Sequence, residues 1–441
     1  MEKGSSDALL IYTSGVTPRV SFIVDALFSK TILTDSKERF LGHTGARINY
    51  SSENISDHSF RIVPHGLLTE NIIRQQAIDC FEWDEMKVFF ATGGDIPFDI
   101  FSASFYLLSR YEEYLPYEPD AYGRYAHTNS LAFREGFLHL PLVNLWMENL
   151  NAILRSKFPH SEFQIPNLQF QYTPTYDIDI AYAYRHQPLW KNVLGFYRDL
   201  FLGRFEQVAE RGNVYSGKQT DPFDTFEWID ELHEKYGLQP VYFFLTVIKR
   251  GLYDKNLPAR SKALQQLYRR LSVKYISGLH PSWQSGTDEW LLEKEISMLQ
   301  NIIHKPVIIS RNHYLRFTIP HTYRRLCAAG IRDEYSMAYG TINGFRASYT
   351  LPYRWYDLER ELLTELTIHP FCFMEANSSF EQEYSAEEAG EEMQYYYDVV
   401  KKVNGEFITL FHNHFLTEQP QWIAWREMYR GFLDKNFSQD R

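Results

Sequence analysis

The sequence has little cysteine and no region rich in basic residues. Its 441 residues include three cysteines, Cys80, Cys327 and Cys372, which lie far apart. That spacing fits neither a disulfide framework nor a cysteine-based metal site. The net charge is −11, and no arginine-rich run or basic stripe is present. Nucleic acid is therefore not expected as the main partner.

Long apolar runs are also missing. No uncharged apolar segment approaches the ~20 residues that a membrane-spanning helix needs, so no transmembrane segment is expected. The first residues, Met1 to Asp7, lack the basic region and apolar stretch of a signal peptide. We therefore expect a cytoplasmic protein, with an oligomeric state that the sequence leaves open.

Aromatic residues, in contrast, are abundant. The chain has 31 Tyr, 32 Phe and 9 Trp, which together make 16% of its residues. Most of these rings are expected to fill the core. Exposed rings are candidates for stacking on sugar faces, because aromatic side chains offer rigid, amphipathic contact area.

Length and pattern predict two domains. Residues 1–165 are expected to form a small α/β domain that ends in a linker marked by Pro159 and Pro166. Its expected strands are 8–13, 60–63 and 87–91, and its expected helices are 18–30, 100–114 and 142–157. Asp120, Arg124 and Glu135 are candidates for a surface that docks on the second domain.

Residues 166–441 alternate strands with helices. The expected strands are 168–176, 240–246, 274–279, 306–310, 334–339, 364–368 and 406–411. The expected helices are 224–236, 257–272, 288–303, 320–329, 387–402 and 420–434. About seven β/α units in some 275 residues is the size of a β/α barrel. An open doubly wound sheet is the competing fold, but no glycine-rich dinucleotide loop follows the first strand.

Carboxylates, histidines and arginines follow several of these strands. In chain order they are Asp177, Asp179, His280, Arg311, His313, Arg316, His412 and His414. A single histidine near a strand end is more often structural, but four strand ends carry such residues here. Functional residues gathered at the C-terminal ends of successive strands are typical of a barrel active site. Imidazole and carboxylate are also the usual ligands of a catalytic zinc, which takes three protein ligands.

These motifs resemble those of the polysaccharide deacetylases, carbohydrate esterase family four, over roughly residues 166–441. The N-terminal part resembles an uncharacterised α/β domain found in one subgroup, on the segments Gly94 to Asp99 and Leu108 to Tyr114. The resemblance implies a distorted seven-stranded β/α barrel preceded by that small domain. It also implies metal-dependent hydrolysis of N-acetyl or O-acetyl groups on sugars.

The resemblance assigns roles to individual residues. Tyr176-Asp177-Ile178-Asp179 is similar to the family's first motif, with Asp177 as base and Asp179 as metal ligand. The family's two aspartates are adjacent, whereas Ile178 separates them here, so the exchanged assignment stays open. Leu410-Phe411-His412 is similar to the motif whose histidine is the general acid. Arg311 and Arg316 both fall where the family places an arginine that orients the base.

The metal-binding motif departs from the family pattern. His280-Pro281-Ser282 is similar to the second motif, and His280 is a ligand by that resemblance. The family has another histidine four residues later, where this chain has Gln284. His313, at the end of the next strand, is the expected replacement, and His414 is the second choice. The predicted divalent metal site is Asp179, His280 and His313, with zinc the expected ion.

Three functions follow as hypotheses. The first is a metal-dependent deacetylase acting on a carbohydrate. The second is a non-catalytic glycan-binding or scaffold protein in polysaccharide assembly, which the altered second motif favours. A barrel glycosidase ranks last, because Asp177 and Asp179 are too close in sequence to flank a sugar bond from opposite faces.

Overall fold

The computed structural model of the protein describes residues 8–161 and 169–438. The N-terminal part contains a four-stranded sheet in the order β2-β1-β3-β4, and every neighbouring pair is parallel. Its strands are β1 Leu10–Thr13, β2 Ile32–Thr34, β3 Arg47–Tyr50 and β4 Phe60–Ile62. The expected strand at 87–91 is found in a separate hairpin of β5 Phe81–Trp83 and β6 Met86–Val88. The α/β character expected of this part is confirmed.

The helices of this part, α5 excepted, begin at side-chain caps. They are α1 Pro18–Leu27, α2 Lys37–Gly42, α3 Ile100–Leu108, α4 Leu131–Arg134 and α5 Leu142–Lys157. The carboxylate of Asp99 accepts hydrogen bonds from the first backbone N–H groups of α3. A single helix over 100–114 was predicted, and this is wrong. The chain turns at Arg110, which is left-handed (φ 53°), and a 3-10 turn follows over Tyr111–Tyr114.

The remainder of the chain contains a larger sheet. Its order is β12-β13-β11-β10-β9-β8-β7-β15-β14, and only β12 runs antiparallel to its neighbour. The strands are β7 Gln171–Ile178, β8 Val241–Leu245, β9 Ile276–His280, β10 Ile309–Ser310, β11 Asp333–Glu334, β12 Tyr353–Asp357, β13 Leu362–Ile368, β14 Phe373–Met374 and β15 Glu406–His412. A strand is present in each range predicted for this part, although residue 168 lies outside the described residues. The sequence did not predict β12 and β14.

The large sheet curls around a small apolar core. One buried cluster contains Phe243 of β8, Met374 of β14 and Ile408 of β15. Because β14 lies at one edge of the sheet, the sheet must curve for its side chain to reach this cluster. The backbone N–H of Phe371 also donates to the carbonyl of Met337, 3.2 Å away, which links the segments before β14 and after β11. The mixed α/β fold agrees with expectation. Closure into a seven-stranded barrel stays a prediction, because the described strand ladder runs from β12 to β14 without joining its ends.

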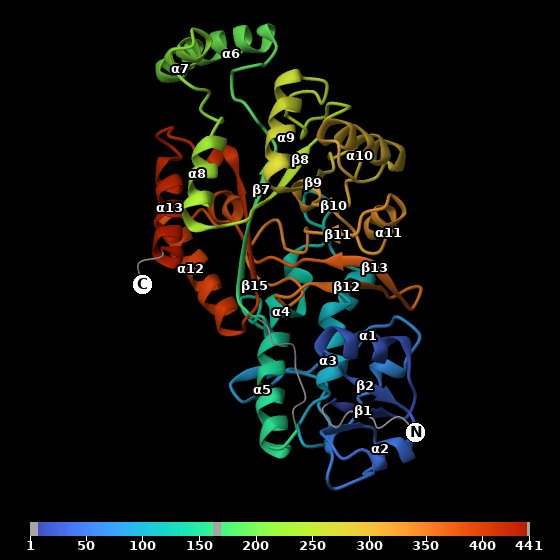
Figure 1. The fold of residues 1–441 in the computed structure, drawn as a ribbon. Helices are drawn as coiled ribbons and strands as arrows, with labels where there is room; N and C mark the ends of the chain where they lie inside the picture. Colours follow the sequence, from blue (N-terminus) through green and yellow to red (C-terminus); the bar gives the residue numbers. More distant parts are fainter. Residues whose placement is uncertain (1–7, 162–168, 439–441) are drawn as a thin grey trace.

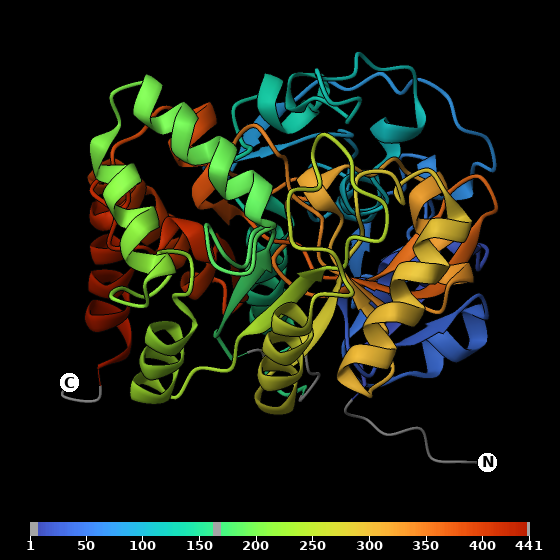
Figure 2. The ribbon, with the colours of Figure 1, turned by 90° about the horizontal axis from the view of Figure 1, so that it is seen from above.

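Helices cover the outside of this sheet. They are α8 Phe226–Tyr236, α9 Lys262–Lys274, α10 Glu289–Ile303, α11 His321–Ala328, α12 Ala386–Lys402 and α13 Ile423–Phe437. Figure 1 shows α8, α12 and α13 on the side of β7 and β15, with α9, α10 and α11 on the opposite side, and Figure 2 shows the same division from above. The predicted helix at 257–272 begins only at α9, because Pro258 keeps the residue before it extended.

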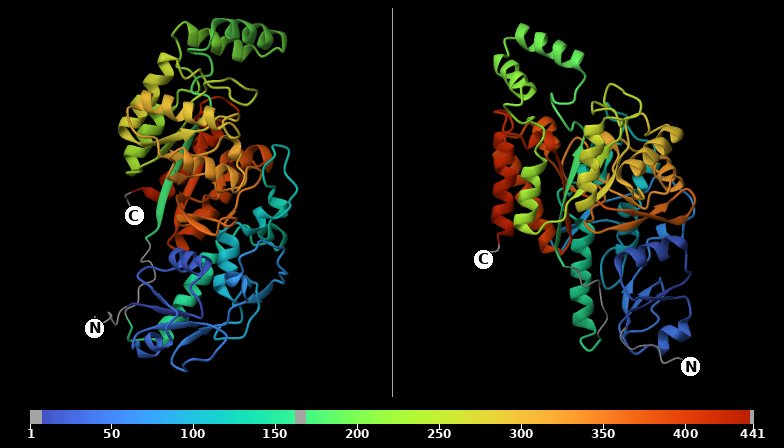
Figure 3. Two further views of the ribbon diagram at one scale, coloured as in Figure 1. Left: turned by 90° about the vertical axis from the view of Figure 1, so that its right-hand side faces the viewer. Right: turned by 45° about the horizontal axis from the view of Figure 1, so that its top comes forward.

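Two further helices were not predicted. They are α6 Leu189–Phe201 and α7 Phe205–Tyr215, which form a hairpin between β7 and α8. Figures 1 and 3 show this hairpin projecting from the body at the end opposite the N-terminal sheet.

Buried ion pairs join the N-terminal part to the larger sheet. The guanidinium of Arg346 donates to both carboxylate oxygens of Glu113 at 2.9 and 2.6 Å, and Arg110 donates to the same carboxylate at 2.8 Å. Arg19 pairs in the same way with Glu361. Removing one partner of such a buried pair leaves an uncompensated charge, so these contacts hold the two parts together. The predicted boundary at 165/166 falls outside the described residues and stays a prediction.

Candidate active site

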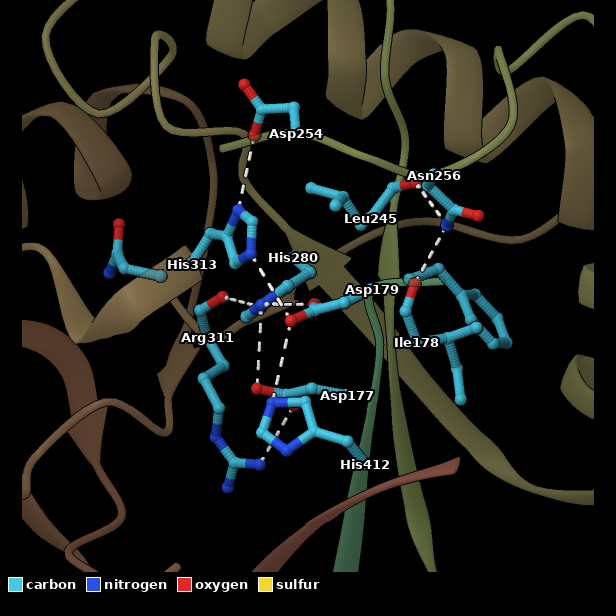
Figure 4. Close-up of polar contacts among 12 residues, drawn as sticks. Asp177, Ile178, Asp179, Leu245, Asp254, Asn256, His280, Arg311, His313 and His412 are labelled. Carbon is cyan, nitrogen blue, oxygen red and sulfur yellow. Dashed lines mark hydrogen bonds and ion pairs between the residues drawn. The ribbon is translucent and has the colours of Figure 1, made fainter. Parts of the chain in front are cut away.

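Two aspartates at the end of β7 face the same pocket. Asp177 and Asp179 both line it, whereas Ile178 between them is buried in the main core. This is the alternation expected of a strand. The side chain of Asn256 donates to the carbonyl of Ile178, 2.8 Å away, and so ties the end of β7 to the loop after β8. The carboxylate pair therefore has a fixed direction (Figure 4).

The predicted metal ligands lie together. Nε2 of His280 is 3.2 Å from Oδ1 of Asp179, and Nε2 of His313 is 3.3 Å from Oδ2. One ligand atom from each of the three residues lies within 4.8 Å of the others. Oδ1 of Asp179 and Nε2 of His280 are buried without a hydrogen-bond partner among the described residues. These two atoms with unmet bonding capacity, together with the nearby Nε2 of His313, fit a divalent metal ion.

The Nδ1 atoms of His280 and His313 also make polar contacts. Nδ1 of His280 lies 2.6 Å from the carbonyl of Arg311, and Nδ1 of His313 lies 3.2 Å from Oδ1 of Asp254. Metal-binding histidines usually donate this N–H to a carbonyl or carboxylate, which fixes the orientation of the ring. The sequence did not single out Asp254, because nothing distinguishes it from other polar residues of the long loop after β8.

Electrostatics keep Asp179 ionised. Burial alone would raise the pKa of this carboxyl, but His313 and His280 outweigh burial and hold the pKa well below its usual range. Burial likewise opposes the charged form of His313, while Asp179 and Asp254 raise its pKa to about 9. A cation bound among these residues would take the place of the histidine protons. The site therefore presents a carboxylate that is ready to act as a ligand.

Asp177 is paired with a buried arginine. Nη1 of Arg311 donates to Oδ1 of Asp177 at 3.1 Å and to the hydroxyl of Thr175 at 2.6 Å. Arg316, the other predicted arginine, lies elsewhere: its Nη1 donates to the carbonyl of Trp283 at 3.2 Å, and its guanidinium covers the Trp283 ring. The structure thus brings Arg311, and not Arg316, to the aspartate pair.

His412 is held by a glutamate that the sequence analysis missed. Its Nδ1 lies 2.6 Å from Oε1 of Glu375, and its Nε2 lies 3.5 Å from Oδ2 of Asp179. Burial opposes the charged ring, but the charge and hydrogen bond of Glu375 raise the pKa of His412 to about 10. Glu375 directly follows an apolar run, Phe371 to Met374. A search for polar residues at strand ends would therefore have indicated it.

His414 lines the same pocket but has a different environment. Its ring centre is 5.4 Å from that of His412, and its Nδ1 has no hydrogen-bond partner among the described residues. Burial, with a further contribution from His412, lowers the pKa of His414 to about 3, so the ring is neutral. The compact group of candidate ligands contains His313 instead.

The pocket has a volume of about 440 Å³ and an aromatic wall. Tyr122, Tyr253 and Tyr314 line it, and Trp283 stacks on Tyr253 with ring centres 4.0 Å apart. The ring centres of Tyr122 and Tyr314 are 5.5 Å apart. Tyr122 comes from the N-terminal part of the chain, so both parts of the molecule form this pocket.

Arg124 supports the same wall. It is one of the predicted docking residues, and Asp120, another of them, accepts from its Nε at 2.6 Å. Nη1 of Arg124 donates to the carbonyl of Tyr314, 2.6 Å away. Tyr314 has a left-handed backbone (φ 58°) directly after His313, a conformation that needs support from its surroundings. Arg124 therefore stabilises the turn that presents His313.

Comparison with known families gives one match. Residues 9–159 match a family model described as a family of unknown function (DUF7033). A comparison with curated proteins finds no match. None of the described helices is both long and apolar enough to cross a bilayer.

Three solved structures that resemble this chain do so only distantly. A candidate polysaccharide deacetylase from Mycobacterium smegmatis is 12% identical, over 63% of this chain and 87% of that one, with a TM-score of 0.39. A polysaccharide deacetylase from Bacillus cereus is 10% identical, over 60% and 87%, with a TM-score of 0.30. A presumed one from Pseudomonas aeruginosa is 9% identical, over 61% and 86%, with a TM-score of 0.37. These scores are too low to carry an argument about function, which rests on the site itself.

Proposed function

We propose that this protein is a metal-dependent hydrolase that removes N- or O-linked acetyl groups from a carbohydrate. The observation that carries the proposal is the convergence of Asp179, His280 and His313, whose ligand atoms lie within 4.8 Å of one another. A spare carboxylate, Asp177, and a spare imidazole, His412, face the same pocket. A metal site, a base and an acid are the groups that metal-dependent hydrolysis of an acetyl group uses.

Asp179, His280 and His313 would hold the ion, for which zinc is the proposal. Mixed nitrogen and oxygen ligands suit zinc, and three protein ligands leave a coordination position open. When bound, the ion supplies Lewis-acid polarisation of the acetyl carbonyl. The contacts of Asp254 with His313 and of the Arg311 carbonyl with His280 orient the two rings for this task.

The remaining polar residues move protons. Asp177, held by Arg311, takes a proton from the water that attacks the acetyl carbon. His412, kept protonated by Glu375, donates a proton to the departing amine or alcohol. Asp177 accepts from Arg311 and lies 3.5 Å from Nε2 of His280. Asp179 lies closer to that nitrogen, at 3.2 Å, and also contacts His313, so the contacts favour this assignment over the exchanged one.

The aromatic wall supports a carbohydrate substrate. Tyr122, Tyr253 and Tyr314 offer ring faces and hydroxyl groups at the pocket, the combination that packs on sugar rings. The motif resemblance to polysaccharide deacetylases implies the same substrate class. A carbohydrate deacetylase in the cytoplasm, the location expected from the sequence, would act on a sugar precursor or a lipid-linked saccharide.

Acetate release from a panel of acetylated saccharides tests the proposal. Metal-loaded protein should release acetate, and Asp177→Asn and His412→Ala should each lose roughly 10²–10⁴-fold in turnover while retaining the metal. His58→Ala, an exposed histidine of the N-terminal part, is the matched control and should behave as wild type. Full activity in both site variants would refute the assigned roles. Saccharide binding without acetate release would favour the glycan-binding alternative.

A further inference from the structure

The α6–α7 hairpin carries its apolar side chains on the outside. Eleven large hydrophobic residues between 189 and 215 are exposed: Leu189, Trp190, Val193, Leu194, Phe196, Tyr197, Leu200, Phe201, Leu202, Phe205 and Tyr215. The side chains that α6 buries are polar, Asn192 and Asp199. A surface helix normally shows the reverse, as α8 does by burying Phe226, Ile229 and Leu232. The outer face of the hairpin is therefore suited to an apolar environment.

Polar contacts inside the hairpin fix this orientation. Arg211 of α7 donates to the side-chain oxygen of Asn192 at 2.9 Å and to the carboxylate of Asp199 at 2.6 Å. Both residues lie on the side of α6 that faces α7, and at 3.6 residues per turn the apolar residues form a continuous face that begins beside Asn192, at Phe196, and extends to the opposite side. The outward apolar face is thus a consequence of specific buried hydrogen bonds.

The tip of the hairpin is its most apolar point. Phe201, the last residue of α6, is 91% exposed, and Leu202 and Phe205 are 53% and 67% exposed. Figures 1 and 3 show this hairpin farther from the N-terminal sheet than the helices around the large sheet. Large apolar side chains at a projecting turn can enter an apolar environment without any movement of the rest of the molecule.

The charge of this segment is opposite to that of the whole chain. Residues 185–218 contain six basic residues, Arg185, Lys191, Arg198, Arg204, Arg211 and Lys218, and three acidic ones, Asp199, Glu206 and Glu210. Six minus three gives a net charge of +3, in a chain of net charge −11. On α6, Lys191 and Arg198 border the apolar face. Basic residues beside an apolar, aromatic helix face are typical of helices that lie in the plane of a membrane interface.

We propose that the α6–α7 hairpin binds the surface of a membrane that contains anionic lipids. The apolar face and the tip would enter the boundary between headgroups and acyl chains, while the flanking lysine and arginines would contact lipid phosphates. Charge disfavours a second copy of this chain as the occupant, because two hairpins placed face to face would bring net charges of the same sign together.

The hairpin lies beside the candidate active site. Lys255 lines both the pocket that contains Asp177 and Asp179 and a second cleft formed by Trp190, Lys191 and their neighbours at the base of α6. A saccharide carried on a membrane lipid would therefore lie near the catalytic residues. This consequence rests on the proposed deacetylase function, whereas membrane binding by the hairpin does not.

Vesicle flotation of the full chain tests the inference. The chain should float with vesicles of phosphatidylcholine and phosphatidylglycerol, and less with phosphatidylcholine alone. The triple variant F201S/L202S/F205S should lose at least about tenfold in partitioning. The double variant K191Q/R204Q should lose about fivefold for each charge removed, and only on the anionic vesicles.

Matched controls separate this effect from a general loss of surface hydrophobicity. Val273 of α9 and Trp290 of α10 are 81% and 63% exposed, and V273S/W290S should float as wild type does. Wild-type chain that stays in solution with both kinds of vesicle would overturn the inference. So would a wild-type dimer that becomes monomeric in F201S/L202S/F205S, since the face would then be a contact between copies. Neither result depends on acetate release, so the deacetylase proposal stands or falls separately.

Discussion

Nδ1 of His313 lies 3.2 Å from Oδ1 of Asp254, a residue of the loop after β8. Because Nδ1 is engaged there, the other ring nitrogen of His313 faces Asp179, 3.3 Å away. We propose that His313, which follows β10, serves in place of the histidine that the family motif has where this chain has Gln284.

Asp254→Asn should weaken metal binding although it alters no proposed ligand. Loss of the carboxylate charge behind a metal-binding histidine typically costs about 10–100-fold in affinity, because the ring is less basic. Asparagine retains the oxygen that accepts from the backbone N–H of Trp283, so the loop should stay in place. Calorimetric titration of metal-free protein with zinc measures the effect. An unchanged dissociation constant would contradict the positioning role.

Glu375→Gln should shift the alkaline limb of the activity profile to lower pH. His412 must be protonated to donate, and Glu375 raises the pKa of its ring to about 10, so wild type keeps the acid form through neutral pH. Removing the negative partner lowers that pKa, and the acid form then disappears at a lower pH. The turnover number measured against pH shows the shift. Glu381→Gln, at an exposed glutamate of the same pocket, should leave the profile unchanged.

The sequence predicted the strands that carry the site well, and their surroundings less well. Most of the predicted ranges contain a strand because they are short apolar runs bounded by turn residues, whereas β11, Asp333–Glu334, shares only residue 334 with its predicted range. The two-residue strand β14 was missed because so short a run has no periodicity. The hairpin of α6 and α7 was missed because its apolar face suggests burial, while the structure exposes it.

The candidate site likewise contains residues that the sequence indicated and residues that it did not. Asp177, Asp179, His280, His313 and His412 each stand next to a strand end, where position in the chain carries information. Asp254 lies in a loop, and its contact with His313 depends on how that loop folds back. Tyr122 and Arg124 are also far in sequence from the residues they meet at the pocket: Arg124 and Tyr314 are 190 positions apart. No local sequence pattern indicates a contact between residues so far apart in the chain.

Glu295→Gln should remove a pH dependence of stability. Glu295 of α10 is buried and accepts from the backbone N–H of Ser282 at 3.0 Å, and burial raises the pKa of its carboxyl from 4.5 to about 7. The folded state therefore binds more protons than the unfolded state between these values, so stability falls as pH rises through this window. The loss is on the order of 3 kcal/mol at most.

Urea unfolding at about pH 5 and about pH 8 measures this effect as the free energy of unfolding. Glutamine keeps the oxygen that accepts from Ser282 but does not titrate. The difference in free energy between the two pH values should therefore be smaller in the variant than in wild type. Equal pH dependence in the two proteins would show that Glu295 is not responsible.

Tyr122→Ala should weaken substrate binding more than turnover. The ring forms part of the aromatic wall, and loss of one stacking surface is worth about two- to tenfold in KM. The metal ligands lie on other elements, so zinc content should not change. Tyr122→Phe keeps the ring and is the matched control, with a KM near that of wild type. A drop in kcat at constant KM would argue against a role in binding the sugar.

Equilibrium dialysis against zinc tests the central claim most directly. Wild-type protein should bind one zinc ion per chain, and His280→Ala and His313→Ala should each lose most of that binding while keeping the far-ultraviolet circular dichroism of the folded chain. His414→Ala should bind zinc as wild type does, because His414 stands outside the group of Asp179, His280 and His313. Full zinc binding in His313→Ala, or none in wild type, would contradict a metal site formed by these three residues.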